Sequence, residues 1–225
     1  MESIFIDKLE VLRYLGHKGQ DIDADLNSLI DSCINEVKEK VIPKQVFETY
    51  EIERIDDAIE IKGTRLKLVG DDIASCLENC DKVILMAVTL GNEIEKMIRL
   101  SQRRDMTKTV ILDSIATTYV EAVCDKIEDE IYTKYKKLGK SLSFRYSPGY
   151  GDLPLSVQGE FLDTLNARRV IGLNLTNTNL LTPRKSVTAI LGVKNEESKR
   201  FKRTCENCLN YNTCKFRKDG VKCGD

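Results

Sequence analysis

Three stretches of the chain repeat apolar residues every three or four positions, which is the period of an amphipathic helix. They cover residues 5–15, 23–41 and 108–138. The third stretch is the longest, and its apolar face consists of Ile111, Ile115, Tyr119, Val123, Ile127 and Ile131. Gly139 follows this stretch and is expected to end the helix. We therefore predict three helices, one of them long enough to organise a core.

Between the second and third helices the period shortens to two residues, as in β-strands. Residues 46–52 alternate in this way, and so do residues 59–61 and 66–68. The sequence Lys-Gly-Thr at 62–64 separates the last two segments, which predicts a hairpin. Residues 82–89 (KVILMAVT) form a continuous apolar run of strand length, so we expect a buried strand.

The remaining elements are expected to be shorter. A short helix should begin at Asp71 and end near Cys80, and Asn92 should cap the following helix with Glu95 as its capping-box partner. Further along the chain we expect a helix over residues 155–166 and two strands that complete the sheet, over residues 173–181 and 186–193.

Hairpins and long helices without regular strand–helix alternation favour an α+β fold. We therefore predict an antiparallel sheet flanked by long helices over residues 1–200, followed by a small Cys-rich segment at residues 201–225. Apolar residues make up 41% of the chain, but no apolar run approaches the ~20 residues of a membrane span. The first residues lack the pattern of a signal peptide, so a cytoplasmic protein is expected.

Charge and cysteine content add one candidate site. A net charge of -1 argues against a dedicated nucleic-acid-binding protein. Four cysteines crowd the last part of the chain with the spacing C-x2-C-x5-C-x8-C, namely Cys205, Cys208, Cys214 and Cys223. In a reducing compartment such a cluster indicates a metal site before it indicates disulfides. The spacing fits either Zn or a [4Fe-4S] cluster, and the alternative is a tail that binds no metal.

The most informative segment in the body of the chain is Arg-Tyr-Ser-Pro-Gly-Tyr-Gly at residues 145–151. Gly149 and Gly151 allow positive φ angles and close approach of a ligand to the backbone. Arg145 offers a planar fork for a carboxylate or phosphate, and Tyr150 offers a ring face for a heterocycle. A turn that contains Pro and Gly also forms for purely structural reasons, so the motif alone does not establish a site.

A polar stripe runs along the long predicted helix, opposite its apolar face. It consists of Asp113, Thr117, Glu121, Asp125 and Glu128. A stripe of this kind usually faces solvent, because charged residues are rarely buried without a partner. The pattern by itself therefore favours a solvent-exposed face over a binding site.

Several of these segments together resemble the activation domain of cobalamin-dependent methionine synthase. Arg-x-x-Pro-Gly-Tyr at residues 145–150, with Glu121 on a long helix 24 residues earlier, is similar to the S-adenosylmethionine loop and acidic helix of that family. Residues 181–187 (LTPRKSV) resemble its Trp-Pro-x-x-Ser-Val segment. The likeness spans about residues 5–195 and is clearest from residue 108 onward. An N-terminal Asp that touches the cofactor in the family has Gly16 as its nearest counterpart.

The resemblance implies a role for each matching residue. Arg145 would pair with the ligand carboxylate, and Glu121 would accept hydrogen bonds from the ligand and offset its sulfonium charge. Backbone groups of Ser147, Gly149 and Tyr150 would line the ligand. No catalytic residue is implied.

The implied function is reductive remethylation of cob(II)alamin on a partner methionine synthase or other corrinoid protein, with flavodoxin or ferredoxin as the electron donor. The contribution of this chain would be positioning and exclusion of water. The replacement at Gly16 keeps a second hypothesis open, in which the chain is a metal-bearing scaffold that no longer binds S-adenosylmethionine. A third is that a cluster at the C-terminal cysteines transfers electrons itself.

Overall fold

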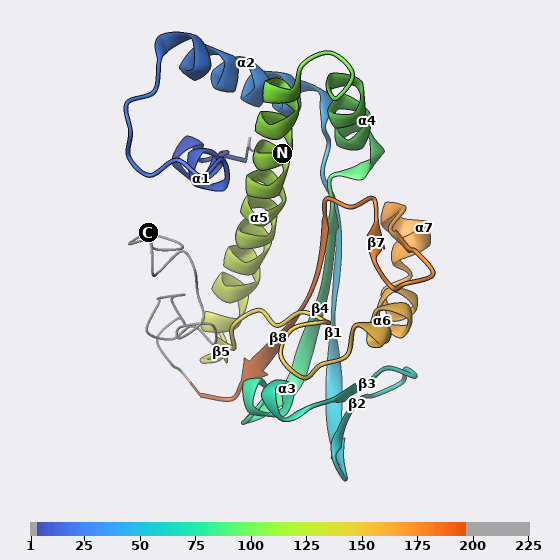
Figure 1. The fold of residues 1–225 in the computed structure, drawn as a ribbon. Coiled ribbons are helices and arrows are strands. Elements are labelled where there is room, and N and C mark those ends of the chain that lie inside the picture. Colours follow the sequence, from blue (N-terminus) through green and yellow to red (C-terminus); the bar gives the residue numbers. More distant parts are fainter. Residues whose placement is uncertain (1–3, 197–225) are drawn as a thin grey trace.

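The computed structural model describes residues 4–196, in which one antiparallel sheet lies between two helical layers (Figure 1). The helices are α1 (Lys8–Tyr14), α2 (Ala24–Lys40), α3 (Asp71–Cys76), α4 (Gly91–Ser101), α5 (Met106–Lys136), α6 (Gln158–Thr164) and α7 (Ala167–Ile171), with a short 3-10 turn at Leu155–Val157 before α6. The predicted α+β architecture is therefore confirmed.

The main sheet has the strand order β3-β2-β1-β4-β8-β5. Its strands are β1 (Lys44–Ile55), β2 (Ala58–Ile61), β3 (Lys67–Val69), β4 (Cys80–Thr89), β5 (Ser141–Leu142) and β8 (Ser186–Lys194). Every neighbouring pair is antiparallel. The hairpin predicted around residues 62–64 is the β2–β3 hairpin, in which Ile59 pairs with Leu68.

Strand β4 lies at the centre of the sheet, and its alternating side chains enter two separate cores. Ile84, Met86 and Val88 point to one face, and Val83, Leu85 and Ala87 point to the other. All six side chains are buried. The predicted buried strand is therefore confirmed, and its cover on both faces explains why the sequence of β4 is an almost continuous apolar run.

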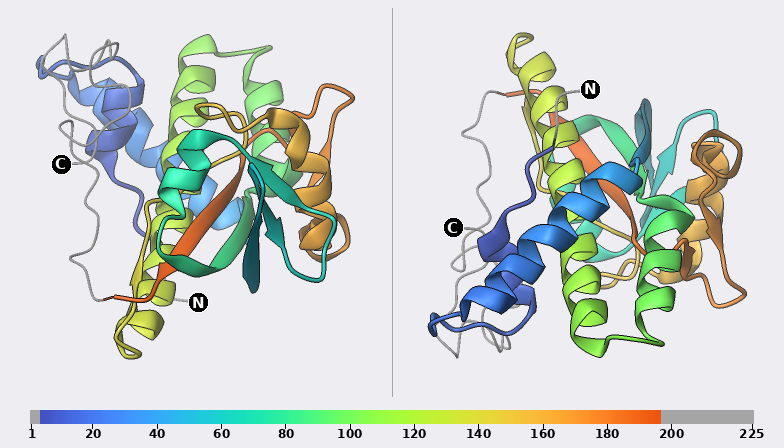
Figure 2. Two further views of the ribbon diagram at one scale, coloured as in Figure 1. Left: turned by 90° about the horizontal axis from the view of Figure 1, so that it is seen from below. Right: turned by 90° about the horizontal axis from the view of Figure 1, so that it is seen from above.

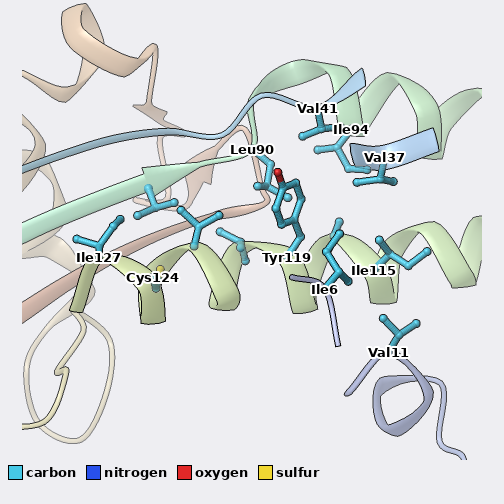
Figure 3. Close-up of a cluster of buried hydrophobic side chains, with 14 of the residues drawn as sticks. Ile6, Val11, Val37, Val41, Leu90, Ile94, Ile115, Tyr119, Cys124 and Ile127 are labelled. Atoms are coloured by element: carbon cyan, nitrogen blue, oxygen red, sulfur yellow. The ribbon is translucent and has the colours of Figure 1, made fainter. Parts of the chain in front are cut away.

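The first face is covered by α5 together with α1, α2 and α4, as the view from above shows (Figure 2). The six predicted core residues of α5 are all buried in this layer. Tyr119 lies in the middle of the cluster, among Val37 and Val41 from α2 and its C-terminal end, Leu90 and Ile94 (Figure 3). The period of apolar residues thus predicted both α5 and the face that it buries.

The second face is covered by α3, α6 and α7. Phe161, Leu165 and Ile171 belong to the same buried cluster as Leu85 of β4 and Ile190 of β8. Residues 144–153 cross the same side of the sheet, where Tyr146 pairs with Ile190 of β8 through backbone hydrogen bonds of 2.9 and 2.7 Å. This pairing fixes the Arg-x-x-Pro-Gly-Tyr segment to the edge of the sheet.

Three local predictions were wrong. Helix α3 ends at Cys76, and Cys80 already belongs to β4. Asn92 lies inside α4 and does not cap it, because the helix begins at Gly91; Glu95 accepts a hydrogen bond from the backbone N–H of Arg184.

The third wrong prediction concerns residues 173–181, which do not complete the main sheet. Asn174–Leu175 (β6) pairs with Leu181–Thr182 (β7) in a separate two-stranded hairpin. The helix expected over 155–166 is followed directly by α7, which was not expected. Among residues 4–196 no helix is long and apolar enough to cross a membrane.

Candidate ligand site

Helix α5 carries the acidic half of the candidate site. Asp105 caps its N-terminus by accepting a hydrogen bond of 2.9 Å from the backbone N–H of Lys108. Because the apolar face of α5 packs on the sheet, the polar stripe predicted from the sequence points away from the sheet. The side chains on this stripe are exposed to very different degrees, from 16% for Glu128 to 65% for Asp125.

Arg145 forms ion pairs with the C-terminal half of this stripe. Its Nη2 lies 3.2 Å from Glu121 and 2.7 Å from Asp125, and its Nε lies 3.3 Å from Glu128. The Arg145 side chain is only 5% exposed. Residues one helical turn apart on α5 therefore converge on a single buried guanidinium group, which the sequence places just before the Pro-Gly turn.

Arg145 stays protonated despite its burial. Burial favours the neutral form, but the carboxylates of Asp125, Glu121 and Glu128 outweigh it, and the pKa of Arg145 is raised above its ordinary value. Its Nη1 is buried and has no hydrogen-bond partner. A buried guanidinium donor without a partner is costly, so an oxygen acceptor would be stabilised here once neighbouring side chains moved to admit it.

The segment after Arg145 forms a tight turn that we call the glycine loop, residues 147–153. The backbone N–H of Tyr150 donates to the carbonyl of Ser147 at 3.1 Å, and the N–H of Gly149 donates to the carbonyl of Leu153 at 2.9 Å. Gly149 has a φ angle of 88°, as its predicted role in a turn requires. Pro148 is buried, whereas the Tyr150 side chain is 63% exposed and available for contact.

The N-terminal half of the polar stripe is paired with a different cation, Lys185. Lys185 Nζ lies 2.9 Å from Asp113 and donates a 2.8 Å hydrogen bond to Thr117. The stripe is therefore not simply a solvated face, because two cations from later parts of the chain bind to it. Sequence reasoning assigned no function to Asp125, Glu128 and Lys185, since their partners lie far away along the chain.

The N-terminal segment reaches the same region. Helix α1 packs against α5, and the Arg13 guanidinium lies 4.4 Å from the centroid of the Tyr14 ring. Burial raises the pKa of the Tyr14 hydroxyl, Arg13 opposes this, and the Glu121 carboxylate adds to the rise. The end of α1, which leads to Gly16, thus lies near the acidic side chain expected to contact the ligand.

Comparison with known proteins places this geometry in a family. The family model for the activation domain of vitamin B12 dependent methionine synthase matches residues 63–212. The chain belongs to this family. No curated protein matches the sequence. Among solved structures, a crystal structure of the MetH reactivation domain bound to AdoHcy is similar, with a TM-score of 0.66 and 16% identity, covering 96% of this chain and 82% of that one.

Membership of the activation domain family confirms the resemblance stated from the sequence, and the solved structure confirms the fold. The match covers both Glu121 and the segment from Arg145 to Tyr150. The structure brings Arg145 and Glu121 into contact, with the glycine loop directly following Arg145. Their roles toward a ligand stay predictions.

The eight cysteines of this family member fall into two groups. Cys33, Cys76, Cys80 and Cys124 are buried, and burial raises the pKa of Cys76 and Cys80 to about 11, so these two are poor metal ligands and nucleophiles. The cysteines predicted to bind metal, Cys205, Cys208, Cys214 and Cys223, lie outside the described residues. Within residues 4–196 there is no group of three or more His, Cys, Asp or Glu side chains that is arranged to hold a metal ion.

Proposed function

We propose that this protein binds S-adenosylmethionine between α5 and the glycine loop and presents it to the cobalamin of a partner corrinoid methyltransferase. The observation that carries the proposal is the position of Arg145. In a chain of the activation domain family, this buried guanidinium lies among three carboxylates and keeps one donor, Nη1, without a partner. Nη1 is enclosed in this structure, so neighbouring side chains would have to move for a ligand carboxylate to satisfy that donor.

The charges around Arg145 match those of the ligand. Three carboxylates and one guanidinium leave the site with a formal charge of about -2, and S-adenosylmethionine carries a carboxylate, an ammonium group and a sulfonium, with a net charge of +1. Arg145 would bind the ligand carboxylate, and Glu121, which is 41% exposed, would face the ammonium or sulfonium. Opposite charges on the site would orient opposite ends of the ligand.

The glycine loop supplies the remaining contacts. Backbone groups of Ser147, Gly149 and Tyr150 would line the ligand, and the exposed Tyr150 ring would offer a face to the adenine or to the approaching corrin. The end of α1 would close the site from the other side. These assignments follow the family motif and are supported by the proximity of Arg145, Glu121 and the loop.

The chemistry would come from the bound partners. S-adenosylmethionine would supply a methyl group as a methyl cation equivalent and leave as S-adenosylhomocysteine, and an electron donor such as flavodoxin or ferredoxin would supply the one electron that cob(II)alamin needs to accept it. The residues of this chain would hold the ligand, orient its methyl group and exclude water. No residue needs to move a proton, which agrees with a site made of a guanidinium, carboxylates and backbone groups.

Isothermal titration calorimetry with S-adenosylmethionine tests the proposal. Binding is expected, and 5′-methylthioadenosine, which lacks the amino-acid part, should bind more weakly because it cannot satisfy Arg145. Equal affinity for the two compounds would remove Arg145 from the site. Absence of binding at millimolar ligand would favour a scaffold role.

We also propose that Cys205, Cys208, Cys214 and Cys223 bind one Zn ion or one [4Fe-4S] cluster. The support is the spacing of the four thiols in a short basic segment with six Lys/Arg and three Asp/Glu. Anaerobically purified protein should contain about one Zn or one cluster per chain, and replacing two of these cysteines by Ser should abolish it. A truncated chain ending at Arg200 that keeps the metal would refute the assignment.

A further inference from the structure

The glycine loop is attached to a second element that the family motif does not include, the first turn of α3. The Asp152 carboxylate accepts hydrogen bonds from the backbone N–H of Asp71 at 2.5 Å and of Asp72 at 3.2 Å. These residues are about 80 positions apart in the sequence, so the contact is tertiary. It satisfies two of the N–H groups that the start of a helix leaves unpaired.

The attachment is reciprocal. Gly70 has a φ angle of 143°, and a Cβ atom there would lie 2.8 Å from the Asp152 carboxyl carbon. Gly151 has a φ angle of 51°, and a Cβ atom there would meet the Asp72 carboxylate and the Tyr146 hydroxyl. Each glycine therefore makes room for the aspartate that belongs to the opposite segment. No larger residue fits either position without moving that aspartate.

Tyr146 connects the glycine loop to the main sheet. Its hydroxyl donates a 3.0 Å hydrogen bond to the carbonyl of Tyr150, and its backbone pairs with Ile190 in the sheet. Burial, followed by the nearby Asp72 and Asp152 carboxylates, raises the pKa of Tyr146 to about 12, so the hydroxyl stays a donor at neutral pH. The loop is thus held on one side by the sheet and on the other by α3.

We propose that Asp152 is a positioning residue, which holds the glycine loop against α3 in the conformation that binds the ligand. This inference rests on the proposed function. The Asp152 side chain does not need to contact S-adenosylmethionine. Its effect is to fix the loop before the ligand arrives, so that binding does not have to order it.

The test compares Asp152→Ala with Asp152→Asn and with the control Asp23→Ala. Asn keeps an oxygen acceptor for the α3 amides. Asp23 also caps a helix, accepting from the Leu26 N–H at 2.7 Å, but it precedes α2, away from the loop. Asp152→Ala should weaken S-adenosylmethionine binding about 3- to 10-fold, the range expected for losing a cap that orders a loop. Asp152→Asn should restore part of the affinity, and Asp23→Ala should leave it unchanged.

Two further readouts separate positioning from general destabilisation. Hydrogen exchange of the ligand-free protein should become faster in residues 147–153 and 70–73 of Asp152→Ala, but not elsewhere. In a double-mutant cycle, Asp152→Ala should cost less affinity in a Tyr150→Ala background, because its effect passes through the loop.

The outcomes are distinguishable. Unchanged exchange in the loop of Asp152→Ala would overturn the attachment itself. Faster exchange with unchanged affinity, or full additivity with Tyr150→Ala, would overturn the positioning role. If the wild-type protein does not bind S-adenosylmethionine, the proposed function and the positioning role both fail, whereas the exchange data still show whether Asp152 holds the loop.

Discussion

The two faces of α5 show how differently apolar and polar positions encode their roles. One face, which includes Ile115 and Tyr119, is buried against the sheet, and its residues contact many neighbours of the same kind (Figure 3). The other face carries Glu121, Asp125 and Glu128, which all contact one residue from a later segment, Arg145. The apolar face therefore supports stability, and the polar face is the one that we propose binds the ligand.

The sharpest test of this division is Ile115→Ala on the apolar face. Ile115 is fully buried, so the substitution should lower the free energy of unfolding by about 2–5 kcal/mol through lost packing and a cavity. Chemical denaturation measures this loss. Affinity for S-adenosylmethionine per folded molecule should stay the same. A large loss of affinity with intact stability would show that the two faces do not have separate roles.

Arg145→Ala should have the largest effect on the polar face. It is expected to weaken S-adenosylmethionine binding by about 1.5–3 kcal/mol, because a charge-assisted pair is lost. Lys185→Ala is the matched control, since Lys185 pairs with Asp113 on the same stripe of α5 but outside the proposed site. Calorimetry on both variants decides the point, and equal losses would show that only the overall charge of the stripe matters.

Glu121→Gln should have a smaller and more selective effect. The Glu121 carboxylate is 41% exposed, so its attraction for a ligand cation is worth about 0.5–1 kcal/mol. The variant should bind S-adenosylmethionine more weakly while binding S-adenosylhomocysteine, which lacks the sulfonium, almost as the wild type does. Equal weakening for both ligands would assign Glu121 to the ammonium group that they share.

The smallest effect is expected for Asp125→Asn. Asp125 is 65% exposed, and solvent screens its contact with Arg145, so affinity should change by less than about 0.5 kcal/mol and the change should vanish in high salt. Glu128→Gln should cost more, because Glu128 is only 16% exposed. The reverse order, measured by titration at low and high salt, would contradict the use of burial to rank these carboxylates.

Much of the fold could be predicted from the sequence, because local spacing determines which face of an element is apolar. The core face of α5, the β2–β3 hairpin and the buried strand β4 all follow from such patterns. The sequence predicted one strand of the main sheet over residues 173–181, whereas β6 and β7 form a separate hairpin whose two-residue strands carry no clear period. Their pairing depends on the turn between them rather than on burial.

The candidate site was only partly predictable, for a related reason. Arg145 and Glu121 were found through a family motif, and the Pro-Gly turn explained the shape of the loop. The contacts of Arg145 with Asp125 and Glu128, and those of Asp152 with α3, join segments far apart in the chain. No spacing rule indicates such partners, because a charged residue on a helix surface has the same local pattern whether it faces solvent or a remote cation.

The most direct test of the proposed function is a spectrophotometric recovery assay. A partner methionine synthase loaded with cob(II)alamin is mixed with S-adenosylmethionine and a low-potential reductant, in the presence of this protein, of its Tyr150→Ala variant, or of neither. We predict that the methylcobalamin spectrum returns rapidly only with the wild-type protein, and much more slowly with Tyr150→Ala. Identical recovery with and without this protein would contradict the proposal that it presents the methyl donor to cobalamin.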